Sequence, residues 1–253
     1  GKIKTKIDAN KIKRSETLRI ANAPNKNQFA FQPVVDIIQK RTFFVEALIR
    51  GPKGEKAEEY LANMNKDDLK IFDMHSTSDA IALATQLNIP NLSVNFNPKT
   101  LFETENIVDI LEEMLSKYGF NNNQLIIEIT EKDIISNYQN AFNTLTQLRA
   151  SDIRIAVDDF GAGYSGLSLL ADYQPDIIKV DRSIIANIHH SWAKQTIVKS
   201  IFNCADSMAI SVCVEGLENE EDLQCLLEIG IKKFQGFLFG KPTINSYSEI
   251  NFN

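Results

Sequence analysis

Residues 153–181 read IRIAVDDFGAGYSGLSLLADYQPDIIKVD, a stretch with two β-branched runs at 153–157 and 176–180. The 18 residues between these runs include three glycines. A crossover between parallel strands needs about a dozen residues or more, so this connection is long enough to contain a helix. The stretch therefore predicts a parallel α/β unit whose first strand is followed directly by the acids Asp158 and Asp159.

The same alternation extends over most of the chain. Eight runs are candidate strands: 29–35, 43–49, 92–96, 125–129, 153–157, 176–180, 210–215 and 233–237. Apolar residues at helical spacing lie between them, as in 107–115 and 223–227, and Gly119 and Gly230 follow where those helices should end. Eight strands alternating with helices predict a (β/α)8, or TIM, barrel, and 253 residues are close to the ~250 typical of that fold.

One connection departs from this pattern. Only residues 36–41 separate the first two candidate strands, which is too short for a parallel crossover. These two strands are expected to form an antiparallel hairpin. The predicted fold class is therefore α/β, a modified TIM barrel with one reversed strand near the N-terminus.

Charge is distributed unevenly along the chain. Residues 1–26 contain eight Lys or Arg and two Asp or Glu, whereas the other 227 residues contain 19 basic and 31 acidic ones. We expect residues 1–26 to form a basic linker or N-terminal helix and residues 27–250 to form the barrel. The acidic body excludes binding of long nucleic acid through a broad basic face.

The composition also bears on the compartment. No apolar run approaches the ~18 residues that span a bilayer, and no signal-peptide pattern opens the chain. Three cysteines without a C-x-x-C pair favour ordinary core residues in a reducing environment. A cytoplasmic location is expected, including as the cytoplasmic part of a larger sensor protein with a domain upstream of this chain.

Polar residues stand where the predicted strands end, and the active sites of α/β barrels lie at these carboxyl ends. They are Glu46, Asn95, Glu128, Asp158, Asp159, Lys179, Asp181, Glu215 and Gln235. Carboxylates that converge on one barrel mouth repel each other unless cations lie between them. All-oxygen ligand sets suit Mg²⁺ or Mn²⁺ rather than zinc. The number of ligands indicates two ions, an arrangement that stabilises the attacking and leaving oxygens of a phosphoryl displacement.

Lys179 lies in an apolar strand beside this proposed metal cluster. A lysine there can orient a metal-bound hydroxide or accept a proton from attacking water, and the alternative is that it only balances the acidic mouth. Enolase-like proton abstraction also uses lysine with metal-holding carboxylates, but the paired aspartates argue against it. Glycerophosphodiester hydrolysis is disfavoured because no histidine stands at a strand end.

Several short motifs occur in order along residues 29–242, and together they resemble the EAL-type cyclic di-GMP phosphodiesterases. The signature triplet is Glu46-Ala47-Leu48, within Val45-Glu46-Ala47-Leu48-Ile49-Arg50. The others are Phe31-Gln32-Pro33, Val94-Asn95, Glu128-Ile129-Thr130-Glu131, Asp158-Asp159-Phe160-Gly161, Ile178-Lys179-Val180-Asp181, Val214-Glu215-Gly216, and the run from Gln235 to Pro242.

The resemblance implies roles for individual residues. Metal ligands would be Glu46, Asn95, Glu128 and Asp158 for one ion, with Asp158 bridging and Asp159 and Glu215 completing the second site. Lys179 would face the attacking water, and Glu46 and Glu215 would share the catalytic role. Contacts to the dinucleotide would come from Gln32, Arg50, Asp181, Gln235 and Pro242. Glu131 and Ser165 would steady the glycine-rich loop, a regulatory element linked to dimerisation.

The implied activity is metal-dependent hydrolysis of cyclic di-GMP to linear pGpG in bacterial second-messenger signalling, with two Mg²⁺ or Mn²⁺, inhibition by Ca²⁺, and a homodimer. The alternative is a catalytically weak or silent cyclic di-GMP receptor that acts through a protein partner. The chain departs from the family most clearly after Arg50, where the short turn 51–54 replaces a longer insertion beside the substrate mouth. Asn97, Ala162 and Phe237 also replace the more common Ser, Thr and Tyr, but none of them is an expected metal ligand.

Overall fold

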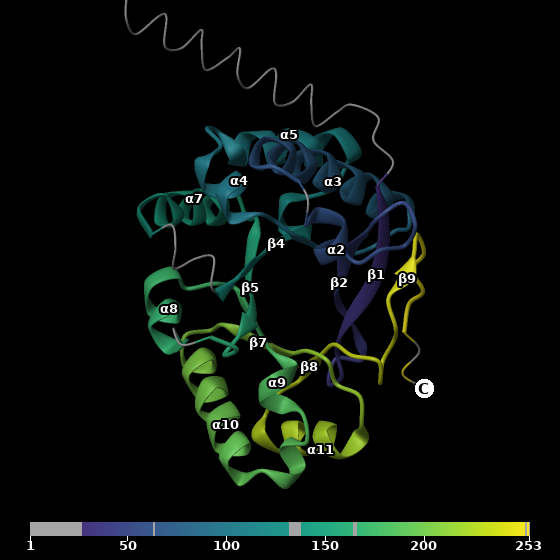
Figure 1. The fold of residues 1–253 in the computed structure, drawn as a ribbon. Coiled ribbons are helices and arrows are strands. Elements are labelled where there is room, and N and C mark those ends of the chain that lie inside the picture. The colour runs from purple at the N-terminus through teal and green to yellow at the C-terminus, as the bar shows by residue number, and fades with distance from the viewer. Residues whose placement is uncertain (1–26, 63, 132–137, 164–165, 251, 253) are drawn as a thin grey trace, which may run out of the picture.

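The computed structural model describes residues 27–62, 64–131, 138–163, 166–250 and 252. Within these residues, eight strands close into a barrel surrounded by helices (Figure 1). Strands β2 to β8 run parallel, and β1 is antiparallel to both of its barrel neighbours, β2 and β8. The predicted TIM-like barrel with one reversed N-terminal strand is confirmed.

The strands alternate with helices along the chain. The strands are β1 (Gln28–Asp36), β2 (Arg41–Arg50), β3 (Leu92–Asn95), β4 (Leu125–Thr130), β5 (Arg154–Phe160), β6 (Ile177–Val180), β7 (Ser211–Val214), β8 (Lys233–Phe234) and β9 (Thr243–Ile244). The α-helices are α2 (Ala57–Leu61), α3 (Lys66–Gln86), α4 (Pro98–Glu103), α5 (Ile107–Tyr118), α7 (Tyr138–Ala150), α8 (Gly166–Tyr173), α9 (Arg182–Ile185), α10 (Trp192–Ser207) and α11 (Glu220–Ile229). Two short 3₁₀ turns are η1 (Asn122–Gln124) and η2 (Ile188–His190).

The hairpin forms because residues 37–40 are too few to cross the barrel. Its strands pair from Gln28 with Arg50 to Asp36 with Arg41, and a register shift falls between Val34 and Val35. Only the start of the predicted last strand, 233–237, is paired: β8 contains two residues, and the chain then turns. It returns as β9, which pairs with β1 at Ala30 and Phe31, so both ends of the same edge of β1 are covered.

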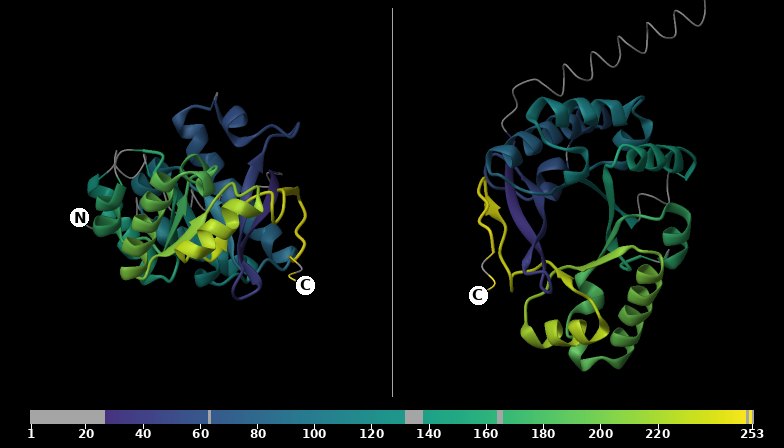
Figure 2. Two further views of the ribbon diagram at one scale, coloured as in Figure 1. Left: turned by 90° about the horizontal axis from the view of Figure 1, so that it is seen from below. Right: turned by 180° about the vertical axis from the view of Figure 1, so that it is seen from behind.

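Helices cover the outside of the barrel, as the two views in Figure 2 show. In α5 the apolar residues at helical spacing are buried, and Gly119 ends the helix in the left-handed conformation with φ 68°. Gly230 ends α11 in the same way, with φ 114°. Both helix ends agree with the sequence, because glycine adopts positive φ without a steric penalty. No helix of the described residues is long and apolar enough to cross a membrane.

Candidate active site

The candidate site is a polar layer that stands directly on an apolar floor inside the barrel. The floor is a cluster of fully buried side chains from six strands: Val34, Phe44, Ile126, Ala156, Ile177 and Cys213. Side chains two positions apart along a strand point to the same face. The next inward residues are therefore Gln32 on the reversed strand and, on the others, Glu46, Glu128, Asp158, Lys179 and Glu215. The strand period alone brings these predicted residues to one mouth.

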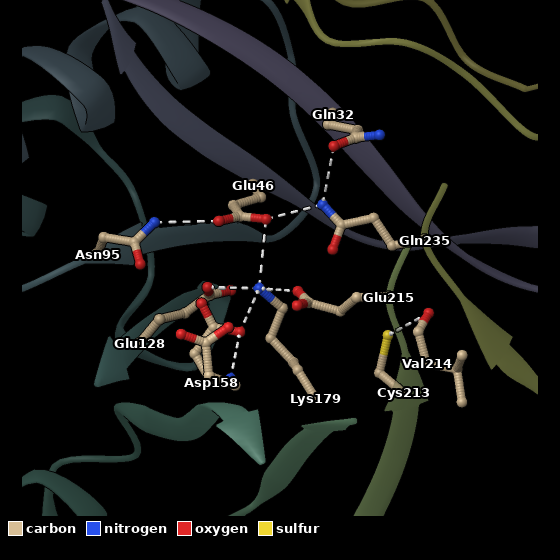
Figure 3. A network of polar contacts seen from close by, with 11 residues as sticks. Gln32, Glu46, Asn95, Glu128, Asp158, Lys179, Cys213, Val214, Glu215 and Gln235 are labelled. Atoms are coloured by element: carbon tan, nitrogen blue, oxygen red, sulfur yellow. Dashed lines mark hydrogen bonds and ion pairs between the residues drawn. The ribbon is translucent and has the colours of Figure 1, made fainter. Parts of the chain in front are cut away.

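Lys179 is the centre of this layer and is fully buried (Figure 3). Its Nζ lies 2.5 Å from Glu215 Oε1 and 2.7 Å from Glu128 Oε2. The same atom lies 3.2 Å from Glu46 Oε2 and 3.4 Å from Asp158 Oδ1. One ammonium group thus contacts four carboxylates, three on the strands β2, β4 and β5 and one directly after β7.

Amide side chains hold Glu46 from the other sides. Asn95 Nδ2 donates to Glu46 Oε1 at 3.0 Å, and Gln235 Nε2 donates to Glu46 Oε2 at 2.7 Å. Gln235 Nε2 also lies 3.3 Å from Gln32 Oε1, and Gln32 Nε2 donates to the carbonyl oxygen of Gly240 at 3.0 Å. These contacts fix the Glu46 carboxylate and connect it to the turn after β8.

Two carboxyls of the cluster favour the protonated form. Burial raises the pKa of Glu128 to about 8, and the negative charges of Glu46 and Asp158 act in the same direction. Burial also raises the pKa of Glu215 well above its ordinary value, although Lys179 opposes this effect. Burial and the repulsion between neighbouring carboxylates thus favour protons at these two positions, and a bound cation would take the place of those protons.

Glu46 and Lys179 are held in their charged forms. Burial acts to raise the pKa of Glu46, but the charge of Lys179 and the hydrogen bonds from Gln235 and Asn95 lower it below its ordinary value. Burial acts to lower the pKa of Lys179, but the surrounding carboxylates keep it well above its ordinary value. Lys179 is therefore an ammonium hydrogen-bond donor in this environment.

A bulge in β5 brings Asp159 to the mouth beside Asp158. The pairing of β5 with β6 shifts register between Val157 and Phe160, and Asp159 has a left-handed backbone with φ 54°. Aspartate tolerates this conformation better than most residues. Carboxylate oxygens of Asp158, Asp159 and Glu215 thus lie within 4.8 Å of one another, as do those of Glu46, Glu128 and Asp158. Asp158 belongs to both groups.

The donor set fits divalent cations. Glu128 Oε1 and Gln235 Oε1 are buried and have no hydrogen-bond partner within the described structure. Unpaired buried acceptors are costly, and a hard cation would satisfy them. The two overlapping carboxylate groups contain five of the six ligands expected from the sequence, and Asn95 contacts Glu46 beside them.

Two cavities open beside the cluster. One, of about 270 Å³, is bounded by Glu46, Asp158 and Glu215 together with Gln32, Gln235 and the loops that follow β7 and β8. The other, of about 260 Å³, is mostly apolar and extends from Asn95 and Glu128 toward α2 and α3. Leu48 of the signature triplet borders both. Carboxylates of the cluster therefore border both cavities.

The expected regulatory residue Glu131 contacts the glycine-rich loop. Its carboxylate is buried directly after β4 and accepts a hydrogen bond from the backbone N–H of Gly161 at 2.9 Å. A Cβ on Gly163 would lie 3.5 Å from the same carboxyl group, so the loop passes close to it. Ser165, the expected partner of Glu131, lies outside the described residues.

The other expected substrate contacts occupy different positions. Arg50 borders the apolar cavity, and its Nη1 donates to the carbonyl oxygen of Ile49 at 2.8 Å. Asp181 caps α9 by accepting from the backbone N–H of Ser183 at 2.9 Å, and it does not border either of these cavities. Pro242 is half-buried directly before β9. Their proposed contacts with substrate stay predictions.

Sequence reasoning missed three charged residues at the cavities. Arg182 and Glu218 border the carboxylate cavity and form an ion pair of 2.6 Å between Nη2 and Oε2. Each lies within three residues of a predicted site residue, and this proximity was the available signal. Asp73 borders the apolar cavity, where burial raises its pKa to about 7 against hydrogen bonds from Thr100 and Asn97. Asp73 lies inside a helix, so no strand-end rule indicated it.

Comparisons with known proteins agree with this geometry. The EAL domain model matches residues 15–242. The chain is 33% identical over 228 residues to the blue light- and temperature-regulated antirepressor BluF of Escherichia coli K12, a match that covers 88% of this chain and 56% of BluF. It is 35% identical over 160 residues to the cyclic di-GMP phosphodiesterase PdeF of the same organism, covering 62% of this chain and 21% of PdeF.

A solved structure shares the fold. The manganese and cyclic di-GMP complex of Klebsiella pneumoniae BlrP1 at pH 9.0 superposes with a TM-score of 0.85 and 40% identity, over 90% of this chain and 59% of BlrP1. The chain thus spans little more than half the length of BluF and BlrP1 and about a fifth of PdeF. Because the family match covers most of the sequence and the barrel and its motifs agree, the chain belongs to the EAL domain family.

Proposed function

We propose that this chain is a metal-dependent phosphodiesterase that hydrolyses cyclic di-GMP to linear pGpG in bacterial second-messenger signalling. One observation carries the proposal: two carboxylate groups that share Asp158 surround a buried lysine at the barrel mouth. The name of PdeF and the cyclic di-GMP bound to BlrP1 support the choice of substrate.

Two Mg²⁺ or Mn²⁺ are the proposed cofactors. Glu46, Asn95, Glu128 and Asp158 would hold one ion, and Asp158, Asp159 and Glu215 the other. The cations would supply positive charge where negative charge develops on the phosphoryl oxygens.

The protein's own residues position and move protons. Lys179, held as an ammonium by its neighbours, donates a hydrogen bond that orients the attacking water. Glu215 lies 2.5 Å from Lys179 at the cavity and would accept a proton from that water in its ionised form, which a cation bound to its carboxylate would favour. Water then adds across one P–O3′ bond, leaving a 5′-phosphate on one nucleotide and a 3′-hydroxyl on the other.

The two cavities support a substrate with two bases. Each borders carboxylates of the cluster and both share Leu48, so a phosphodiester at the cluster would have room for a nucleoside in each cavity. Gln32 and Gln235 border the first cavity and Arg50 the second. Arg50 has a guanidinium suited to a phosphate oxygen once it leaves its backbone contact.

The test is direct incubation with cyclic di-GMP. The purified chain with Mg²⁺ or Mn²⁺ is expected to produce pGpG, detected by nucleotide separation. Glu46→Gln and Lys179→Ala are each expected to lower turnover at least about a thousandfold, whereas Glu228→Gln on the exposed end of α11 should match the wild type. Unchanged turnover in either site variant contradicts the role of that residue, and no product from the wild type contradicts the proposed activity.

A second candidate is a cyclic di-GMP receptor that acts through a protein partner. It is favoured by the relative BluF, which is named an antirepressor. Tight binding of cyclic di-GMP without pGpG formation, even with Mn²⁺, would support the receptor. Because the whole expected ligand set lies together, hydrolysis is the leading proposal.

Three further expectations accompany the proposed enzyme. Ca²⁺ should inhibit, because its larger, more flexible coordination favours a different ligand geometry from that of Mg²⁺. A homodimer in the cytoplasm, linked to an upstream sensor domain, is proposed from the family resemblance. Light scattering after size exclusion tests the dimer, and excess Ca²⁺ in the turnover assay tests inhibition.

A further inference from the structure

Phe237 is an exposed aromatic residue at the edge of the carboxylate cavity. Its side chain is 55% exposed, and it borders the cavity together with Gln235. The next two residues, Leu238 and Phe239, pack against the core, where the Phe239 ring stacks on Phe234 with centroids 6.2 Å apart. The turn thus packs two of three successive apolar side chains partly against the core and leaves the third exposed at the cavity.

The backbone around Phe237 is held in place. Gly236 packs so closely on Leu217 that a Cβ at position 236 would overlap the Leu217 backbone. Leu217 N–H donates to the Gln235 carbonyl oxygen at 3.0 Å, and Leu238 N–H donates to the Leu217 carbonyl oxygen at 3.2 Å. The exposed ring is therefore presented by a fixed turn, two residues after Gln235, whose amide holds Glu46.

Lys241 adds a contact on the ring itself. Its Nζ lies 5.3 Å from the Phe237 ring centroid, a cation–π distance. This contact favours one orientation of the ring and leaves more than half of the side chain exposed. The other side chains at this cavity are mainly carboxylates, amides and the Arg182 guanidinium, which suit phosphate and metal rather than the face of a base.

We propose that Phe237 is a stacking platform for one guanine base of bound cyclic di-GMP, and so a specificity-determining residue. The inference rests on the proposed function. A base on an aromatic face gains stacking and buries apolar surface, and neither gain depends on the metal cluster. The effect should therefore appear in substrate binding and not in the chemical step.

Steady-state hydrolysis of cyclic di-GMP with Mn²⁺ tests the proposal in four variants. Phe237→Ala should raise KM about tenfold, within the range of base–aromatic stacking, while kcat stays within about twofold. Phe237→Leu, which keeps apolar volume but lacks an aromatic face, should raise KM at least about threefold, and Phe237→Tyr should stay within about twofold. Phe142→Ala, at a ring of similar exposure (58%) on α7, is the matched control and should leave KM unchanged.

The outcomes separate this inference from the proposed function. If the wild type hydrolyses cyclic di-GMP and Phe237→Ala keeps its KM, only the stacking role is overturned. A wild-type KM in Phe237→Leu assigns the contact to apolar surface and also overturns stacking. A wild type that neither binds nor hydrolyses cyclic di-GMP overturns both. Circular dichroism confirms that each variant is folded before its kinetics are compared.

Discussion

Lys179 is a buried cation on which the metal-free cluster depends. Replacing it by Met leaves four carboxylates near one another without their common partner. Breaking a buried ion pair from one side costs about 3–5 kcal/mol, so Lys179→Met should lower the free energy of unfolding by about that amount. Urea denaturation in EDTA measures the loss, with Lys70→Met on the exposed face of α3 as the control.

The same variant reports on metal binding. Mn²⁺ that neutralises these carboxylates should recover part of the lost stability, and the gain should be larger for Lys179→Met than for the wild type. Equal unfolding free energies of variant and wild type in EDTA would show that the buried contacts contribute nothing.

Glu128 makes the stability of the metal-free protein depend on pH. Its folded pKa is raised from 4.5 to about 8, so between these values the folded chain holds a proton that the unfolded chain has released. Stability should therefore fall as pH rises from about 4.5 to 8, with a slope of up to about 1.4 kcal/mol per pH unit from this one group. Urea unfolding at several pH values in EDTA, on the wild type and Glu128→Gln, measures it.

Glu128→Gln should flatten this dependence, because the amide does not titrate. Glu215, whose pKa is also raised, leaves a residual slope of the same sign. Stability that rises between pH 5 and 8 in the metal-free wild type would refute the assignment. Mn²⁺ should oppose the fall, because a cation displaces the proton from its ligand.

The position of a site residue was predictable where the two-residue period of a single strand decides which way its side chain points. Glu46, Glu128 and Lys179 converge because each stands two positions beyond an apolar floor residue. Contacts between different loops were not predictable. The ion pair of Arg182 and Glu218 depends on how the turns after β6 and β7 approach each other, and no local pattern encodes that distance.

The loop after β5 connects the expected metal ligand Asp159 to the buried carboxylate of Glu131. Glu131 Oε2 accepts from Gly161 N–H, two residues beyond Asp159. Glu131→Ala removes this contact and should lower turnover about tenfold or more, because Asp159 loses its support. It should lower the free energy of unfolding by only about 1–3 kcal/mol, the range for one lost buried hydrogen bond.

Glu131→Gln keeps an acceptor oxygen and should retain most of the turnover. Comparing kcat and urea unfolding for the two variants separates loop positioning from general stability. Wild-type turnover in Glu131→Ala would remove the loop from the mechanism.

At the level of elements, the lengths of the connecting segments predicted the strand directions better than composition did. The short segment 36–41 identified the reversed strand correctly, because chain length alone forbids a crossover there. The bulge at Asp158 and Asp159 was not predictable, since its left-handed residue is an aspartate rather than a glycine. The early end of β8 was also missed: the predicted strand continued through residues 235–237, but these residues leave the sheet and border the carboxylate cavity.

At the scale of the whole molecule, the negative net charge and the local cluster of carboxylates have different consequences. The net charge of −6 argues against long nucleic acid, yet five carboxylates are concentrated in two groups at one end of the barrel. Divalent cations at these groups would turn a repulsive mouth into a site that attracts a phosphodiester. A small dinucleotide is therefore compatible with an acidic protein.

The number of metal ions bound per chain tests whether these two carboxylate groups hold two cations. Calorimetric titration with Mn²⁺ should give two ions per chain, and EDTA should abolish turnover. Asp158 belongs to both carboxylate groups, whereas Asp159 belongs to one. Asp158→Asn should therefore weaken the binding of both ions, and Asp159→Asn should reduce the number of bound ions from two to one. If both substitutions change the number and affinity of bound ions equally, Asp158 is not shared between two ions. If the wild type binds one ion, the site is a single-metal centre.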